Sequence, residues 1–493
     1  MRTTRNWIRA IVASTALTAA CLMFSGYAKA EAVPYIGYTY DGWGDRVWSP
    51  AAYVPDRVVD GETLGIGGFN NPEDLFVSLN KHVYIADTEN NRVVELNEKY
   101  EFVRQIGQFI HQGKTDSLLK PRGIYATPEG DLYIADTGNH RVVRLKQGGN
   151  EADLIILAPK SEYFAGDYVF DPKKIAVDSA GRILVIADRV FDGIMEFDEK
   201  GIFQNFFGAN RATYNAADYF WKRYFATKAQ KERMVQFVPT EYTNLALDEI
   251  DFVFTTNAER NGTPIKRLNP SGTDVLLRQG LFNPIGDVKY DSRSGPSTLV
   301  DISVGPDGTY SAIDVIRGRI FTYDSEGKLL YVFGHDGDRV GNFKTPSAIE
   351  RMGDSIVVLD KELARITTFK ATKFGRLVND AVHNHYIGKE KQAAELWREV
   401  LSLDENYELA YSGISKADFR AGDNEKAVKE AKYALDRNAY SKAYKHLRTD
   451  VLKRHFNTIL TTILALVAAW IAWTRVRTFK RRKRGASHVD RTL

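Results

Sequence analysis

Short apolar stretches separated by turn residues fill the first two thirds of the chain, and their order repeats. Residues 83–93 read VYIADTENNRV and residues 132–142 read LYIADTGNHRV, an offset of 49 positions. Around each copy lie an earlier apolar stretch, a tight turn after the Asp, and two later apolar stretches. Short apolar runs bounded by Gly, Asn, Asp or Pro are typical of β-strands. Four such strands in every ~40–50 residues are the pattern of a β-propeller blade.

Four further copies follow the same order. The third begins at Pro172 and ends its second strand near Asp188, and the others occupy residues 243–277, 301–334 and 346–369. Six copies predict a six-bladed ring over residues 31–373. Residues 35–59 precede the first full copy. We expect them to add a strand to the last blade and close the ring, because an open sheet edge favours aggregation.

The segments ADTENNRV and ADTGNHRV resemble the signature of the NHL-repeat family of six-bladed propellers. The resemblance extends over roughly residues 65–370. It implies that the Asp and Arg of each copy are structural residues of turns and blade packing, and that His140 belongs to the repeat and is not a metal ligand. The residues assigned to this structural role are Asp87, Arg92, Asp136, Arg141 and Asp188.

After Lys373 the apolar spacing becomes helical. Residues 388–406 align with 422–439 at an offset of 34, with Gly388 opposite Gly422 and Leu401 opposite Leu435. This resembles the tetratricopeptide repeat, although the proline expected after each second helix is missing. The resemblance implies a helical segment over 374–455, with a capping helix at 440–454. Two functions stay open for it, a groove for a partner or a rigid stalk.

The next stretch predicts a membrane anchor. Residues 456–474 carry no charged side chain, and at about 1.5 Å per residue they span nearly the ~30 Å of a bilayer core. Trp470 and Trp473 lie near the end of this run, as interfacial aromatic residues do. The tail, residues 475–493, holds eight Lys/Arg and one Asp, so the positive-inside rule places it in the cytoplasm.

The N-terminus predicts export. Basic residues at Arg2, Arg5 and Arg9 precede an apolar run at 10–24 and the tripeptide Ala-Lys-Ala at 28–30, which is the pattern of a secretory signal peptide over residues 1–30. Lipidation at Cys21 is the alternative. Cleavage after residue 30 leaves a chain without cysteine, which suits an exported bacterial protein better than a eukaryotic one.

Charge limits the class of partner. Residues 31–474 hold 55 Lys/Arg and 62 Asp/Glu, a net charge of −7, and the basic excess of the chain lies in its two ends. An acidic body argues against nucleic acid as a partner.

One segment interrupts the repeat. Residues 209–236 lack strand alternation and consist mostly of good helix formers, so a helical insertion is expected on a propeller face. Its aromatic residues either pack the insertion onto the propeller or form a candidate binding surface. They are Tyr219, Phe220, Trp221, Tyr224 and Phe225.

Catalytic motifs are not evident. The sequence has no G-x-S-x-G, H-E-x-x-H or Walker motif, and we predict no catalytic, cofactor-binding or metal-binding residue. Calcium in the central channel stays open, because gluconolactonase-like propellers hold a divalent ion with Glu, Asn and Asp from several blades and this chain has abundant acidic residues. Residues 335–342, HDGDRVGN, fit an inter-blade linker better than a calcium loop.

These features predict a membrane-anchored extracytoplasmic scaffold. We expect its propeller and helical repeats to bind an envelope protein or a carbohydrate-type ligand. An association with a transporter is expected by analogy alone. The alternative is a metal-dependent, gluconolactonase-like hydrolase or lyase that uses the channel. Carboxylates converging in the channel would favour the enzyme, whereas an apolar or basic channel would favour binding.

Overall fold

The computed structural model describes residues 33–489 except 162–163, 165–167, 209–240 and 258–261. The predicted signal peptide and the aromatic insertion with Trp221 lie outside the described residues. The chain divides into two compact units, residues 1–376 and 377–493.

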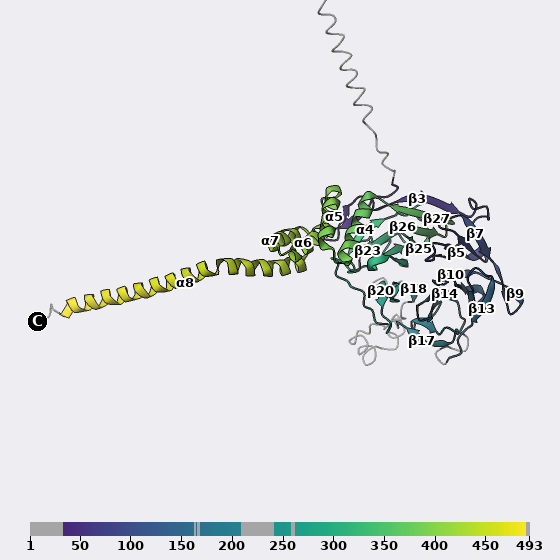
Figure 1. The fold of residues 1–493 in the computed structure, drawn as a ribbon, viewed down its shortest axis with the longest axis horizontal. Helices are drawn as coiled ribbons and strands as arrows, with labels where there is room; N and C mark the ends of the chain where they lie inside the picture. The colour runs from purple at the N-terminus through teal and green to yellow at the C-terminus, as the bar shows by residue number, and fades with distance from the viewer. Residues whose placement is uncertain (1–32, 162–163, 165–167, 209–240, 258–261, 490–493) are drawn as a thin grey trace, which may run out of the picture. The chain divides into compact units, whose positions relative to one another are not determined.

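The first unit is a six-bladed β-propeller (Figure 1), which confirms the predicted fold class. Blade 1 consists of β4 (Asp74–Val77), β5 (Val83–Asp87), β6 (Arg92–Leu96) and β7 (Phe102–Ile106). Blade 2 consists of β10 (Pro121–Ala126), β11 (Leu132–Asp136), β12 (Arg141–Leu145) and β13 (Glu151–Ile156), extended by β8 (Gln108–His111) and β9 (Lys114–Ser117). Blade 3 consists of β14 (Pro172–Val177), β15 (Ile183–Ala187), β16 (Ile194–Phe197) and β17 (Phe203–Phe207).

Besides blade 2 with its two added strands, blades 4 and 5 depart from the expected four strands. Blade 4 has three strands among the described residues, β18 (Tyr242–Leu247), β19 (Val253–Asn257) and β20 (Ile265–Leu268). Blade 5 has six, because β1 (Tyr38–Tyr40) and β2 (Arg46–Trp48) join β21 (Leu299–Val304), β22 (Tyr310–Asp314), β23 (Arg319–Tyr323) and β24 (Leu329–Phe333). The sequence pattern did not reveal that the N-terminal hairpin pairs with β24.

The last blade closes the ring as expected. It consists of β25 (Pro346–Met352), β26 (Ser355–Asp360), β27 (Arg365–Ala371) and the N-terminal strand β3 (Tyr53–Asp60). β3 pairs antiparallel with β27 from Arg365↔Asp60 to Ala371↔Tyr53, and the two lie side by side in Figure 1. Ring closure therefore joins segments from opposite ends of the propeller sequence.

The second strand of each blade lies in the core. All five residues of β5, β11, β15, β19 and β22 are buried. Each blade packs between two others, so both faces of this strand are covered, and the apolar runs of β5, β11 and β15 are continuous instead of alternating. This burial explains why the second strands carry the clearest repeat signal in the sequence.

The first strand of each blade borders the central channel. β4, β10, β14, β18, β21 and β25 each contact the next around the ring. In blades 2 to 6 the register shifts after the first residue of this strand, as between Pro172 and Lys174 in blade 3. The first residue after the shift, such as Gly123 in blade 2, occupies an equivalent position in each of these blades. Asp74 is its counterpart in blade 1, because Asp74 and Gly123 each pair with the Ala that precedes the motif Asp.

The second unit is helical. It contains most of α4 (Lys373–Tyr386), then α5 (Glu390–Leu403), α6 (Glu408–Arg420), α7 (Asn424–Tyr433) and α8 (Arg437–Val489). From α5 onward each helix packs on the next, and a Cβ at Gly413 would lie 2.3 Å from the Trp397 indole nitrogen. The small residue on α6 thus makes room for the large one on α5.

The helix α8 is continuous through the regions predicted as a cap and as a membrane anchor (Figure 1). Its 53 residues extend for about 80 Å at the α-helical rise. By length and composition it can cross a membrane, and its apolar window is not buried within the protein.

Candidate functional site

The motif aspartate of blade 1 is the centre of a hydrogen-bond network. The buried Asp87 carboxylate accepts hydrogen bonds from the Asn70 backbone N–H at 2.7 Å and the Asn90 side chain at 2.8 Å. Arg92 donates through Nε at 2.7 Å. One carboxylate therefore ties the preceding connection, the turn and the third strand together.

Blade 2 repeats this network 49 residues later. Asp136 accepts from the Leu119 N–H at 2.7 Å, from Asn139 at 2.9 Å and from Arg141 Nε at 2.7 Å. Arg141 also binds Asp116 on β9 at 2.7 and 3.0 Å.

Asp188 of blade 3 has different partners. Its carboxylate lies 2.5 Å from Lys173 Nζ and 2.8 Å from Arg122 Nη1. Partial burial opposes ionisation, but the two cations together hold the pKa of Asp188 below its usual range. This aspartate links blades 2 and 3 through an ion-pair network at the start of their inner strands.

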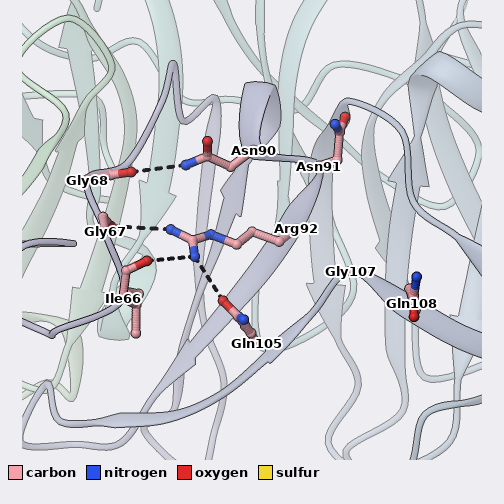
Figure 2. A pocket seen from close by; sticks show the side chains of 9 residues that line it. All are labelled: Ile66, Gly67, Gly68, Asn90, Asn91, Arg92, Gln105, Gly107 and Gln108. Atoms are coloured by element: carbon pink, nitrogen blue, oxygen red, sulfur yellow. Dashed lines mark hydrogen bonds between the residues drawn. The ribbon is translucent and has the colours of Figure 1, made fainter.

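The blade 1 network borders an open hollow of about 650 Å³ (Figure 2). Arg92 reaches across it and donates from Nη1 to the Ile66 carbonyl at 2.9 Å and to Gln105 Oε1 at 2.8 Å. Asn90 donates to the Gly68 carbonyl at 3.0 Å. The polar groups of this blade 1 hollow are thus largely engaged with one another.

Blade 5 has a hollow of about 700 Å³ at the corresponding place. Both are formed by the connection before the blade, the turn between its second and third strands, and the end of its fourth strand. Arg319 occupies the place of Arg92, five residues after the motif aspartate. The blade 5 hollow has an additional wall from the β1–β2 turn. Its lining is Gly44, Asp45, Arg46, Lys289, Tyr290, Asp291, Ser294, Ile316, Arg317, Arg319, His335 and Asp336.

Behind this hollow lies a buried carboxylate with five partners. Asp287 accepts from the hydroxyls of Tyr38 and Tyr40, each at 2.6 Å. Three guanidinium groups also contact it, from Arg319 at 2.5 Å, Arg46 at 3.0 Å and Arg317 at 3.3 Å. Burial raises the pKa of Asp287, but the two hydroxyls and the arginines outweigh it and hold that pKa below its usual range. The N-terminal hairpin is thereby tied to blade 5.

The pKa of Tyr40 is raised, whereas that of Asp287 is lowered, because burial and the negative charge of Asp287 both oppose ionisation of the hydroxyl. Together they raise the pKa of Tyr40 to about 12. Tyr40 therefore stays a hydrogen-bond donor at neutral pH.

A second polar cluster lies in the central channel. It contains Asp74 on β4, Lys174 on β14, and Asp301 on β21, all at the equivalent inner-strand position, together with Glu350 on β25. Lys174 Nζ hydrogen-bonds to Asp74, and its charge also acts on Asp301 and Glu350.

Backbone groups complete the cluster. Asp74 accepts from the Ile124 N–H at 2.8 Å, and Asp301 accepts from the Ile349 N–H at 2.6 Å. Each carboxylate thus accepts a hydrogen bond from the inner strand of the following blade. At the same position of blade 2 a Cβ on Gly123 would lie 2.1 Å from the Lys173 carbonyl oxygen, so that blade has no room for a side chain there.

Burial perturbs the titration of this channel cluster. It raises the pKa of Asp74, raises that of Asp301 to about 7, and raises that of Glu350 well above its ordinary value. The charge of Lys174 opposes the shift at Asp74 and Asp301, and these carboxylates keep the pKa of Lys174 above its usual value despite burial.

Lys174 lies among the carboxylates of the channel and hydrogen-bonds to Asp74. Asp74 and Asp301 also accept from backbone N–H groups. Across the described residues, no group of three or more His, Cys, Asp or Glu side chains is arranged to hold a metal.

Neither cluster was predicted from the sequence. The predicted repeat residues form pairs within blades, Asp87 with Arg92 and Asp136 with Arg141. Aligning the inner strands would have placed Asp74, Lys174 and Asp301 at one level of the channel. The aromatic candidates around Trp221 lie outside the described residues.

Comparison with known proteins supports the repeat. Residues 118–145 match the family model of the NHL repeat. No curated protein sequence matches the chain.

Solved propeller structures show distant likeness. Virginiamycin B lyase from Staphylococcus aureus, in an inactive form with quinupristin, is 13% identical, with a TM-score of 0.38 over 61% of this chain and 80% of that one. A protein assigned as a gluconolactonase is 13% identical, with a TM-score of 0.40 over 69% of this chain and 98% of that one. Hydrazine synthase from Kuenenia stuttgartiensis is 10% identical, with a TM-score of 0.37 over 62% and 96%. At these values no activity is transferred to this chain.

Proposed function

We propose that this protein is a membrane-tethered binding protein whose propeller holds the binding site in the blade 5 hollow. The observation that carries the proposal is the origin of the lining residues. The β1–β2 turn contributes Asp45 and Arg46, and the connection before β21 contributes Lys289 and Tyr290. The connection before blade 1 also lines its hollow, but that hollow has no wall from an added hairpin such as β1–β2.

The β1–β2 turn and the connection before β21 bring residues to the hollow that the repeat itself does not require, and such residues favour ligand binding. Blade 1 builds the same Asp–Arg network without a charged wall of this kind. The blade 1 hollow is similar in volume, but its side chains satisfy one another. The additional segments of blade 5 therefore favour a ligand site.

The tether is α8. In this proposal the signal peptide exports residues 31–455, residues 456–474 cross the membrane, and the basic tail stays in the cytoplasm, as the positive-inside rule requires. The helices α5–α7, which resemble tetratricopeptide repeats, separate the propeller from the anchor in the sequence.

The topology has a direct test. Protease added to intact protoplasts should remove the propeller and spare a tag at the C-terminus. A tag that is cleaved from outside would refute the tether as described.

The binding function is tested with the tagged full chain purified from membranes. Bound proteins and extracted small molecules are identified by mass spectrometry for the parent, for the double variant Lys289→Ala/Tyr290→Ala, and for the control Gln108→Ala in the blade 1 hollow. We expect a species that the double variant loses and the control keeps. Identical bound species in all three would refute the hollow as the binding site.

A hydrolase or lyase is the second candidate, and one observation favours it. Asp74, Asp301 and Glu350 converge in the channel, and a carboxyl with a pKa near 7 can exchange a proton at neutral pH. Lys174 is among them, however, and its pairing with Asp74 uses this charge structurally. Measuring lactone hydrolysis with and without calcium, for the parent and for Asp301→Asn, tests the enzyme. Turnover that Asp301→Asn abolishes would establish it.

A further inference from the structure

We propose that the blade 5 hollow takes a neutral polyhydroxylated ligand, a sugar or short oligosaccharide. This inference rests on the proposed binding function and names its ligand class. It is drawn from the charge balance, the pattern of donors and acceptors, and the exposed apolar surface of the hollow.

The charges of the blade 5 hollow nearly balance, with four cationic side chains against five carboxylates. Its cationic side chains are those of Arg46, Lys289, Arg317 and Arg319. Carboxylates lie beside them: Asp45 contacts Lys289 at 2.6 Å, Asp314 contacts Arg317 at 3.2 Å, and Asp287 contacts all three arginines. Asp291 and Asp336 add further negative charge to the lining. The hollow therefore offers a small anion or cation almost no unbalanced charge, and a neutral ligand requires none.

Donors and acceptors alternate along this wall. A hydroxyl group donates one hydrogen bond and accepts two, so it can bond a carboxylate and a cationic side chain at once. The Asp45–Lys289 pair offers both kinds of group, with side chains 66% and 55% exposed. Arg46 lies beside this pair with 41% of its side chain exposed. A ligand with adjacent hydroxyl groups matches this arrangement.

The blade 5 hollow also exposes apolar surface. Tyr290 is 45% exposed and Ile316 is 42% exposed, and both belong to its lining. A pyranose ring has an apolar C–H face that buries well against an aromatic or aliphatic side chain. A volume of about 700 Å³ lies within the usual range of small-molecule sites.

The blade 1 hollow can be compared with the blade 5 hollow, because the two lie at corresponding places in their blades. Arg92, Gln105 and Asn90 bind one another or backbone carbonyls there, so few groups remain to receive hydroxyls. The equivalent Arg319 in blade 5 is held by the buried Asp287 instead of by backbone carbonyls. Both arginines are thus engaged, and the exposed polar groups of the blade 5 hollow include those of Asp45, Lys289 and Arg46.

The test uses the purified full chain in a detergent without sugar head groups. Glucose, maltose, cellobiose, xylobiose and chitobiose are titrated by calorimetry and by saturation-transfer NMR. We expect saturable binding of at least one of these sugars, weakened at least tenfold by Tyr290→Ala and by Lys289→Ala. The matched control is Phe102→Ala, which removes a 40% exposed aromatic side chain from β7 and should leave binding unchanged.

The possible outcomes distinguish a failure of the sugar assignment from a failure of the proposed binding function. Failure of every sugar to bind, or binding that Tyr290→Ala leaves unchanged, would overturn the sugar assignment. If the membrane purification meanwhile finds a protein that Lys289→Ala/Tyr290→Ala loses, the binding function stands and the sugar assignment falls. Binding of citrate or spermidine in preference to the sugars would overturn the charge argument.

Discussion

Replacing Lys174 by methionine removes the one cationic side chain of the channel cluster and retains much of its apolar volume. The substitution leaves Asp74 without its ion-pair partner and removes the positive charge that acts on Asp301 and Glu350. Breaking a buried ion pair by deleting one member costs about 3–5 kcal/mol, because the remaining charge stays desolvated. We expect a loss of that size in the free energy of unfolding at pH 7.5.

The loss should depend on pH in a defined direction. Without Lys174 the pKa of Asp74 rises further, so the folded state retains protons that the unfolded chain releases near pH 4. Stability of the variant then falls more steeply than that of the parent as the pH rises above about 4. The difference between the two proteins should therefore be smaller at pH 5 than at pH 7.5.

Guanidinium unfolding followed by near-UV circular dichroism measures these values, since several buried tyrosines lie in the propeller. The control is Lys173→Met, the same change one residue earlier. Lys173 pairs with the partly exposed Asp188 and Glu241. Its replacement should therefore lower the free energy of unfolding by about 1 kcal/mol. Equal losses for both variants, or a loss at Lys174 that is constant from pH 5 to 7.5, would refute the reasoning.

Three further predictions concern stability. The Asp301 carboxyl alone should lower stability by on the order of 4 kcal/mol between about pH 4 and 7, because burial raises its pKa to about 7; a free energy of unfolding that falls no more over this range in the parent than in Asp301→Asn would contradict this. Arg92→Ala should cost about 3 kcal/mol because it leaves the buried Asp87 without its cation, whereas Lys120→Ala, in an exposed pair, should cost under about 0.5 kcal/mol. Tyr38→Phe should cost about 1.5–3 kcal/mol in chemical unfolding by removing a hydrogen bond to the buried carboxylate of blade 5, and an unchanged midpoint would exclude that role.

The repeat made the propeller predictable, because residues buried on both faces of each blade must be apolar and each turn needs Gly, Asn or Asp. The ring-closing strand was predictable from the same logic, since a sheet edge must be covered. Helix positions after Lys373 followed from spacing, and α4 begins at that residue.

The polar clusters were not predictable in the same way. Tyr38 and Asp287 are 249 residues apart, and no local pattern signals their contact. Lys174 and Asp301 each look like an ordinary polar residue of a short strand, and only the register shift shared by their blades places them at one level. The pairing of β1 with β24 escaped prediction because a three-residue strand carries almost no periodicity.

Ring closure by β3 has a consequence for biosynthesis. Arg57 and Thr368 pair across 311 residues, so a ribosome makes β3 long before its partner strand exists. Joining ends so far apart costs about 5 kcal/mol in chain entropy, which five completed blades must help to offset. A nascent chain interrupted before Ala371 keeps two open edges and is a target for proteases. Closure thus serves as a check on completeness, and it becomes possible once β27 has been translated and before α8 has been made.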